Sequence, residues 1–452
     1  MEMTLTLRSE IERGIAGLGM NFSEFGEWSG INRGIFSAIL NSNPPKPISL
    51  NQFERITKAL GHPEGWMFEQ YIDECFYDGK PNRRRVEPFL IRCAEMGRLD
   101  CIEIVLSRLL EDLKQLDTIF EIAEALYTAD KVEQSVVFYE CIVQNEKYHQ
   151  SERLAISQYR LFRAALGEDN ERNLRAAIEF EPFCDKLPDH HRLDGLMKLV
   201  NVYFSLDKRI EAARYSREMI VFTEILYQAE VIKNAKSINL KELYSDYPLV
   251  VYYGYAHLAM QKVMIDEGDY IKAEQYIEMY KDLSWFPGLD DNGRREVEKF
   301  KFYAEANVLT IELLKGNENI LPTCITFIEK NPAELLKFIF TILESSNKYG
   351  FNTDIIFEKF SEQLHQYLEQ KYHYDRMTIL NDYCSVCLEA SLYFLKRQNH
   401  IKAIDYILRG LVVAVKINDK EMFMKCVPLF EKNRDLASPK QTLEYVQIME
   451  GI

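Results

Sequence analysis

Apolar side chains recur every three or four positions along most of this 452-residue chain. That spacing places them on one face of an α-helix. It is clearest from about residue 86 onward, for example at Ile102, Val105, Leu106, Leu109 and Leu110. Short polar or glycine-containing turns interrupt it, and no segment alternates apolar and polar residues as a half-buried strand does. The pattern therefore predicts an all-α protein.

A short motif repeats within the helical part. In three places Ile is followed by Glu or Lys, then by Ala, and three residues later by Tyr. These segments are 210–215, 271–276 and 401–406, and looser copies lie near Gly97, Lys131, Gly167 and Gly316. The small alanine suits a point where a second helix crosses close to the first. The motif resembles the tetratricopeptide repeat, which implies that residues 86–452 form a right-handed superhelix of degenerate tetratricopeptide-like hairpins with a concave ligand face.

Residues 20–61 differ from the repeats and predict three short helices. The first is expected from Ser23 to Trp28, the second from Asn32 to Leu40, and the third from Ser49 to Leu60. Gly30-Ile31 supplies a tight turn between the first two. Asn32 and Ser49 are residues that cap helix N-termini, and a glycine follows the third helix, where glycine commonly ends one.

The residues of these helices divide into apolar and polar sets. In and just before the first helix the apolar residues are Phe22, Phe25 and Trp28. In the second helix, Phe36, Ile39 and Leu40 are expected to face inward. The residues expected to face outward are Arg33, Gly34, Ser37, Ala38 and Asn41.

This segment resembles the helix-turn-helix of the Xre family, with the second helix as the recognition helix. The resemblance implies that residues 1–61 form a DNA-binding domain. It also implies that Asn32, Arg33, Ser37 and Asn41 contact base edges or phosphates. The segment departs from the family in the start of its first helix, Asn21-Phe22-Ser23-Glu24, and in the single cation on the outward face of its second. A structural three-helix cap that binds no DNA is therefore the alternative interpretation.

Residues 62–85 are expected to be a connecting helix and linker. The helix is predicted around residues 64–77, and the polar break at residues 78–82 precedes three consecutive arginines, Arg83, Arg84 and Arg85. These arginines suit phosphate contact beside the DNA-binding domain. Alternatively, they form the entry to the next helix and pair with Glu87.

The charge balance restricts any nucleic-acid contact to a local surface. The chain has 55 Lys and Arg against 70 Asp and Glu, for a net charge of −15. Such a chain does not coat nucleic acid non-specifically. No apolar stretch is long enough to cross a membrane, and no secretory signal is visible at the N-terminus. Nine scattered cysteines are typical of reduced thiols, so the expected location is the cytoplasm.

The order of parts resembles the RRNPP peptide-pheromone receptors of Gram-positive bacteria, most of all the phage arbitrium receptors and their bacterial relatives. The resemblance implies a cytoplasmic, homodimeric quorum-sensing transcription regulator, which binds an inverted-repeat operator in double-stranded DNA. It also implies a short signalling peptide on the concave face of the array. The motif spacing places Asn201 and Lys262 toward that face, eleven residues before the motif alanines, with Tyr255 beside Lys262. Arg160 and Asn307 are further candidates. For each residue the alternative is an exposed or inter-helix polar side chain.

No catalytic, metal or cofactor site is expected. The pair Cys384 and Cys387 lies in an apolar helical pattern and is interpreted as core thiols, and His190-His191 as a helix cap and surface. No nucleotide-binding or hydrolase motif occurs. The chain is therefore not expected to be an enzyme. A second function class is a repeat-based module that sequesters or inhibits a partner protein. The residues Ile407, Leu408, Leu411 and Val412 suit either a dimer interface or the core.

Overall fold

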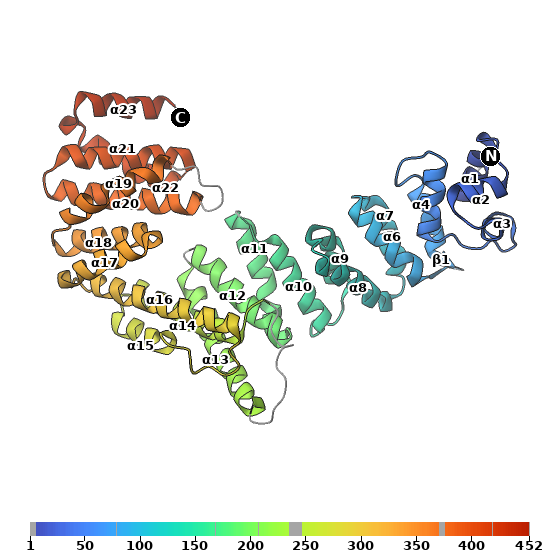
Figure 1. Cartoon of the computed structure of the whole chain (residues 1–452), viewed down its shortest axis with the longest axis horizontal. Coiled ribbons are helices and arrows are strands. Elements are labelled where there is room, and N and C mark those ends of the chain that lie inside the picture. The colour runs from blue at the N-terminus through green and yellow to red at the C-terminus, as the bar shows by residue number, and fades with distance from the viewer. Residues whose placement is uncertain are drawn as a thin grey trace. The chain divides into compact units, whose positions relative to one another are not determined.

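The computed structural model describes residues 6–451 except residues 78, 168, 207, 235–245, 370–375 and 418. These residues form helices almost throughout (Figure 1). Within the described part, the one pair of strands is a short antiparallel ribbon of β1 (Phe76–Tyr77) and β2 (Lys80–Pro81). The predicted all-α class is confirmed, apart from this ribbon.

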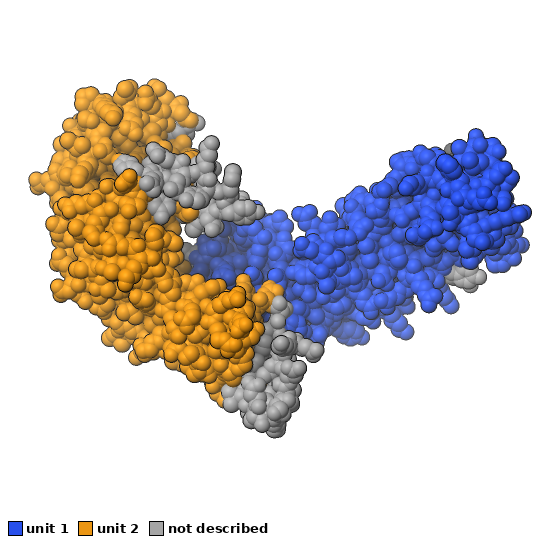
Figure 2. All heavy atoms as spheres, in the orientation of Figure 1, with its two compact units in different colours: residues 1–211, 242–245 blue, residues 212–241, 246–452 orange. Residues whose placement is uncertain are grey.

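Internal contacts divide the chain into two units (Figure 2). The first unit holds the described residues up to Glu211, and the second holds the described residues from Ala212 onward. The division falls inside the helix α13 (Arg209–Asn234). It lies within the segment 86–452 that the sequence assigns to one repeat domain.

The first unit begins with four short helices, α1 (Leu7–Gly17), α2 (Phe22–Ser29), α3 (Arg33–Asn41) and α4 (Leu50–Ala59). One more turn of α-helix, α5 (Phe68–Tyr71), and a 3₁₀ turn at Ile72–Cys75 lead to the ribbon, where the sequence predicts a helix up to residue 77. Longer helices follow: α6 (Arg83–Glu95), α7 (Leu99–Leu109), α8 (Leu116–Thr128), α9 (Val132–Asn145), α10 (Glu152–Ala165), α11 (Asn170–Phe180) and α12 (Asp189–Ser205).

The second unit continues the succession of helices. They are α14 (Leu249–Asp266), α15 (Tyr270–Tyr280), α16 (Asp291–Leu314), α17 (Leu321–Lys330), α18 (Leu335–Tyr349), α19 (Asp354–Glu369), α20 (Arg376–Lys396), α21 (His400–Ile417), α22 (Lys420–Lys432) and α23 (Pro439–Glu450). Consecutive helices pack against each other as hairpins, most extensively α14 with α15 and α20 with α21. The chain is therefore a helical tandem-repeat protein.

The alanine of each motif is a core residue. Ala212, Ala273 and Ala403 are completely buried, as expected where helices approach closely. The isoleucine that opens each motif is instead exposed, and the exposed fractions of these side chains range from 63 to 84% at Ile210, Ile271 and Ile401. The motif thus combines a buried small residue with an exposed large apolar one.

One hydrophobic core runs from the N-terminal helices into the first repeats. Phe53 of α4 stacks on Tyr71 of α5 with ring centroids 4.9 Å apart, and Tyr71 contacts Phe89 of α6 at 5.1 Å. Buried residues from α1 through α9 belong to the same cluster. The core therefore continues across residues 61 and 85, where the sequence places its domain boundaries.

Candidate functional site

The turn between α2 and α3 is fixed by backbone geometry. Gly30 ends α2 in the left-handed conformation with φ +70°, and the Ile31 amide donates to the Gly26 carbonyl at 2.9 Å. A Cβ on Gly26 would lie 2.8 Å from the Ile31 carbonyl oxygen, so a larger residue does not fit there. Arg55 of α4 donates to the Gly30 carbonyl at 3.2 Å. The turn is thus held from both sides.

The start and the faces of α3 follow the sequence prediction. The Asn32 side chain accepts the Gly34 amide at 2.8 Å and caps the helix. Phe36 and Ile39 are fully buried and Leu40 is half-buried, whereas Asn32, Arg33, Ser37 and Asn41 are all exposed. Arg33, Ser37 and Asn41 are four residues apart and therefore form one stripe along the helix. No ion pair to Arg33 is seen within the described residues.

The far end of α3 is held by an ion pair that the sequence does not reveal. Arg8 of α1 donates to the carbonyls of Ile39 and Lys46 at 3.1 and 3.2 Å, and pairs with Glu74 at 2.5 Å. Glu74 is 7% exposed and also accepts the Ile48 amide at 2.8 Å. The segment between α5 and the ribbon thus fixes the end of α3 and the loop that follows. Arg8 and Glu74 are 66 residues apart, so helical periodicity carries no signal for their contact.

The three consecutive arginines start α6 rather than extend as a free loop. Arg83 pairs with Glu87 at 3.3 Å and also with Glu121 of α8. Arg84 is exposed and Arg85 is half-buried. The pairing with Glu87 matches the structural alternative for Arg83, whereas Arg84 keeps an outward position.

The residues predicted to bind peptide have different environments. Asn201 on α12 and Lys262 on α14 are exposed, whereas Tyr255 on α14 is half-buried and burial raises the pKa of its hydroxyl. Asn307 on α16 donates to Gln261 at 3.0 Å and to the Tyr280 hydroxyl at 2.9 Å. Asn307 therefore joins α14, α15 and α16, as the inter-helix alternative proposes.

Arg160, the remaining peptide candidate, lies within a network in the first unit. Its guanidinium donates two hydrogen bonds of 3.0 Å to Glu124 and lies 4.0 Å above the Tyr127 ring centroid. Tyr139 donates to the same carboxylate at 2.5 Å. Burial alone would raise the pKa of Glu124, but the hydrogen bonds from Arg160 and Tyr139 hold it below its ordinary value. The network joins α8, α9 and α10.

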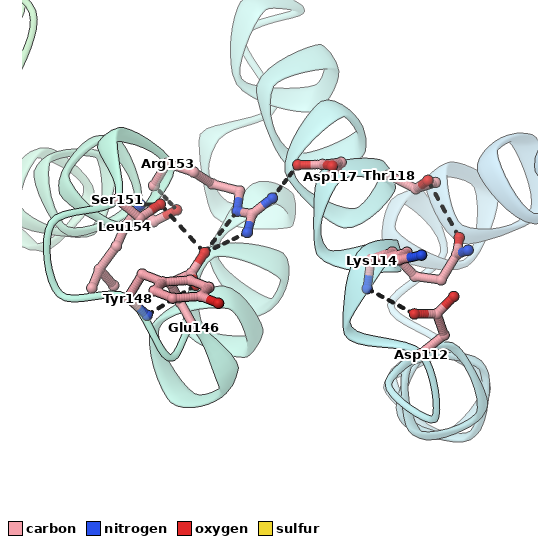
Figure 3. A network of polar contacts seen from close by, with 11 residues as sticks. Asp112, Lys114, Asp117, Thr118, Glu146, Tyr148, Ser151, Arg153 and Leu154 are labelled. Carbon is pink, nitrogen blue, oxygen red and sulfur yellow. Dashed lines mark hydrogen bonds and ion pairs between the residues drawn. The ribbon is translucent and has the colours of Figure 1, made fainter.

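A second polar network fixes the turn from α9 to α10 (Figure 3). Glu146 accepts the Tyr148 amide at 3.1 Å, the Ser151 hydroxyl at 3.3 Å and Arg153 Nε at 3.1 Å. Arg153 also pairs with Asp117 at the start of α8. Burial would raise the pKa of Glu146, but Arg153 holds it below its ordinary value. These contacts stabilise the packing of successive hairpins.

The second unit contains an open groove that the sequence does not predict. It has a volume of about 930 Å³ and lies between α15, α16 and α17. Phe302 of α16 stacks on Phe327 of α17 within it, with ring centroids 5.5 Å apart. Other lining residues are Ile277, Lys281, Lys301, Glu305, Val308, Leu309, Thr326 and Lys330. None of the five predicted peptide residues lines this groove.

Several side chains that the sequence singles out are core residues. Cys384 and Cys387 are completely buried, and burial raises the pKa of both thiols, which confirms their interpretation as core thiols. His191 is also buried, 5.0 Å from the Tyr159 ring, so the prediction of a surface position was wrong for this histidine. Ile407, Leu408 and Leu411 lie in the core as well, whereas Val412 is 41% exposed.

The described residues contain neither a candidate metal site nor a candidate membrane-spanning helix. No group of three or more His, Cys, Asp or Glu side chains is arranged to hold a metal ion in this part of the chain. In the same residues no helix has the length and apolar content needed to cross a bilayer.

No family profile matches the chain, and no curated protein matches it. Similar solved structures include a circular tandem repeat protein with novel repeat topology and enhanced subunit contact surfaces. The two proteins are 12% identical, the match covers 98% of this chain and 89% of that one, and the TM-score is 0.17. Another is a structure of Naa15/Naa10 bound to HypK-THB, 12% identical over 97% of this chain and 84% of that one, with a TM-score of 0.18. Similarity at these TM-scores carries no functional information.

Proposed function

We propose that this protein is a sequence-specific DNA-binding transcription regulator whose helical repeats bind a short signalling peptide. The observation that carries the proposal is the exposed polar face of α3. This helix follows a turn fixed by Gly30 and presents Asn32, Arg33, Ser37 and Asn41 to solvent. A short helix after a tight turn, with polar side chains on its exposed face, suits entry into the major groove.

The chemistry of the exposed stripe suits base recognition better than a purely electrostatic contact. The Arg33 guanidinium can donate a bidentate pair of hydrogen bonds to guanine, and an asparagine amide can do the same with adenine. Ser37 can reach a base edge or a phosphate. The net charge of −15 supplies no general attraction to DNA. We therefore expect any phosphate contacts to come from local cations, such as the exposed Arg84.

A single helix of this size supports only weak binding, which favours a homodimer. The nine residues of α3 extend about 13.5 Å, at about 1.5 Å per residue. Two copies with recognition helices about 34–36 Å apart would contact successive turns of the duplex and read an inverted repeat. The proposed regulator is cytoplasmic, resembles the RRNPP and arbitrium receptors, and has no enzymatic step or cofactor.

A second candidate function is that of a repeat-based module that binds and inhibits a partner protein. Exposed apolar side chains favour it, because Ile210, Ile271 and Ile401 occupy the same position of three motifs and are largely exposed. Covering such side chains with a partner protein would remove apolar surface from water, which favours association. In this alternative α3 binds no DNA.

Selection from a random duplex library distinguishes the two functions. The full-length protein is expected to enrich one family of inverted-repeat sites. Arg33→Ala should abolish the enrichment, whereas the control Arg13→Ala should not, since Arg13 lies on α1 and pairs with Glu10 at 2.8 Å. Failure of the folded wild-type protein to enrich any sequence at low salt would refute the DNA-binding proposal and favour the partner-binding module.

A further inference from the structure

We propose that the groove between α15, α16 and α17 is the site at which the repeats bind the peptide, and that it holds the free carboxyl end of an extended chain. This inference rests on the proposed function, because it identifies where the peptide binds. It also moves the site away from the five residues that the sequence suggests. The groove is lined by residues of three helices of the second unit.

The walls and floor of the groove come from different helices. The helix α16 supplies more of the lining residues than α15 or α17 and is called the floor here; α15 and α17 both pack on it. On α16 the lining residues run from Lys301 to Leu309, a distance of about 12 Å at about 1.5 Å per residue. An extended peptide advances about 3.3 Å per residue, so about four residues fit along this floor. The volume of about 930 Å³ lies at the upper end of small-ligand sites.

One end of the groove is rich in lysine. Lys301 Nζ lies 3.9 Å from an Asp282 carboxylate oxygen, which places the end of α15 beside the Lys301 end of α16. The stack of Phe302 on Phe327 places the end of α17 there as well. The lysines Lys281, Lys301 and Lys330 therefore line this end of the groove. The free carboxylate at the end of a peptide complements these ammonium groups in charge and accepts hydrogen bonds from them.

Among the described residues Lys330 has no acidic partner, unlike the other two lysines. Lys281 pairs with Glu278 at 2.5 Å and Lys301 with Glu298 at 2.8 Å. Lys330 is exposed, and no ion pair to it is found in the described part of the chain. Its ammonium group can therefore bind a ligand anion without breaking an ion pair within the protein. We assign the peptide carboxyl terminus to Lys330.

The rest of the groove suits an apolar and hydrogen-bonding ligand. The Phe302 and Phe327 rings, with Val308 and Leu309 further along α16, offer contact to apolar side chains. The exposed Thr326 hydroxyl donates to a carbonyl of its own helix, which leaves its oxygen able to accept a peptide amide. Glu278, Asp282 and Glu305 also line the groove, so the three lysines are balanced by three acids. This balance disfavours a multiply charged phosphate and favours a zwitterionic peptide.

The test uses the full-length protein and a pool of synthetic hexapeptides with free carboxyl termini. Peptides retained by the wild-type protein are identified by mass spectrometry. The best binder is then measured by isothermal titration calorimetry as the free acid and as the carboxamide. We expect the carboxamide to bind at least about tenfold more weakly than the acid. Lys330→Met should weaken the acid by a similar factor and leave the carboxamide unchanged.

Two further variants make the test specific for the groove. Lys432→Met is the matched control, because Lys432 is also exposed and is the last residue of its helix, α22. It should bind as the wild type does. Val308→Arg should block the groove and remove binding of both forms, while circular dichroism shows an unchanged helix content, since Val308 is 44% exposed.

The outcomes separate this inference from the proposed function. A selected peptide that shifts DNA affinity but binds Lys330→Met and Val308→Arg as tightly as the wild type would overturn the groove assignment and leave the regulator intact. Equal affinity of acid and carboxamide would overturn the carboxylate assignment. If no peptide is retained, the groove assignment fails together with the peptide part of the function, whereas selection of an operator would still support DNA binding.

Discussion

Glu74→Gln should loosen the end of α3 and its following loop without disturbing the distant repeats. The Glu74 carboxylate is 7% exposed, pairs with Arg8 and accepts the Ile48 amide. The glutamine keeps one oxygen to accept hydrogen bonds but removes the charge. Arg8 would then donate to the carbonyls of Ile39 and Lys46 without a carboxylate to balance its charge.

The expected cost follows from the burial of the pair. Removing one partner of a fully buried ion pair costs about 3–5 kcal/mol. Arg8 is 25% exposed and can recover some hydration, and the glutamine oxygen retains one hydrogen bond. We therefore expect the local stability to fall by about 1.5–2.5 kcal/mol. At about 1.4 kcal/mol for each factor of ten, amide exchange in the loop should accelerate about 10- to 60-fold.

Hydrogen exchange measured by mass spectrometry tests this prediction on residues 42–48. Glu10→Gln is the control, because it also removes a carboxylate charge from an ion pair with an arginine of α1, but that arginine, Arg13, is 68% exposed. Such exposed pairs contribute about 1 kcal/mol or less. In a double-mutant cycle, Arg8→Met and Glu74→Gln should couple by about 1–2 kcal/mol. Exchange in Glu74→Gln within threefold of the wild type, or no coupling, would refute the role assigned to the pair.

Three further predictions test separate parts of the structure. Gly30→Ala should destabilise the N-terminal helices by about 1–2 kcal/mol, because Gly30 has φ +70°; urea unfolding with no loss of stability would show that the turn tolerates a side chain. Ala273→Leu should cost about 1–3 kcal/mol, whereas Ile271→Ser should cost less than about 0.5 kcal/mol, since Ala273 is completely buried and Ile271 is 70% exposed; thermal unfolding that ranks them in the opposite order would contradict the packing of the motif. Burial, aided by the charges of His190 and Arg160, lowers the pKa of His191 from 6.5 to about 3, so the unfolded chain takes up a proton in this window while the folded protein does not. Stability should therefore fall as the pH is lowered from about 6.5 toward 3, by at most about 1.4 kcal/mol per pH unit from this group, and His191→Phe should reduce that slope; equal slopes would contradict the buried, neutral histidine.

The sequence predicts local features of the N-terminal helices well. Helix starts at Asn32 and Ser49 follow from side chains that accept hydrogen bonds from the next turn, as the structure shows. The inward positions of Phe36 and Ile39 follow from the helical period. Trp28 is an exception among the apolar residues, because it is 66% exposed while its indole N–H donates to the Ala59 carbonyl at 3.1 Å. An aromatic residue with a polar group can thus remain at the surface.

The sequence pattern could not predict contacts between segments that are distant in the chain. Neither the Arg8–Glu74 pair nor the engagement of Arg160 by Glu124 leaves a periodic signal. The groove is lined by residues of α15, α16 and α17, so it depends on how these three helices pack, which the helical period does not show. The motif spacing identified helices and their buried alanines, but the environments of Asn307 and Arg160 depend on neighbouring helices.

The central claim is that the exposed stripe of α3 reads base sequence, and a specificity ratio tests it most directly. The measurement is the affinity of the full-length protein, at one fixed salt concentration, for its selected site and for a duplex with a single changed base pair in each half-site. When the changed base pair is the one that Arg33 contacts, Arg33→Ala should bring the ratio of the two affinities close to one. It should also weaken binding to the selected site by about 1–3 kcal/mol. A ratio that Arg33→Ala leaves unchanged would contradict the claim that α3 is the recognition helix.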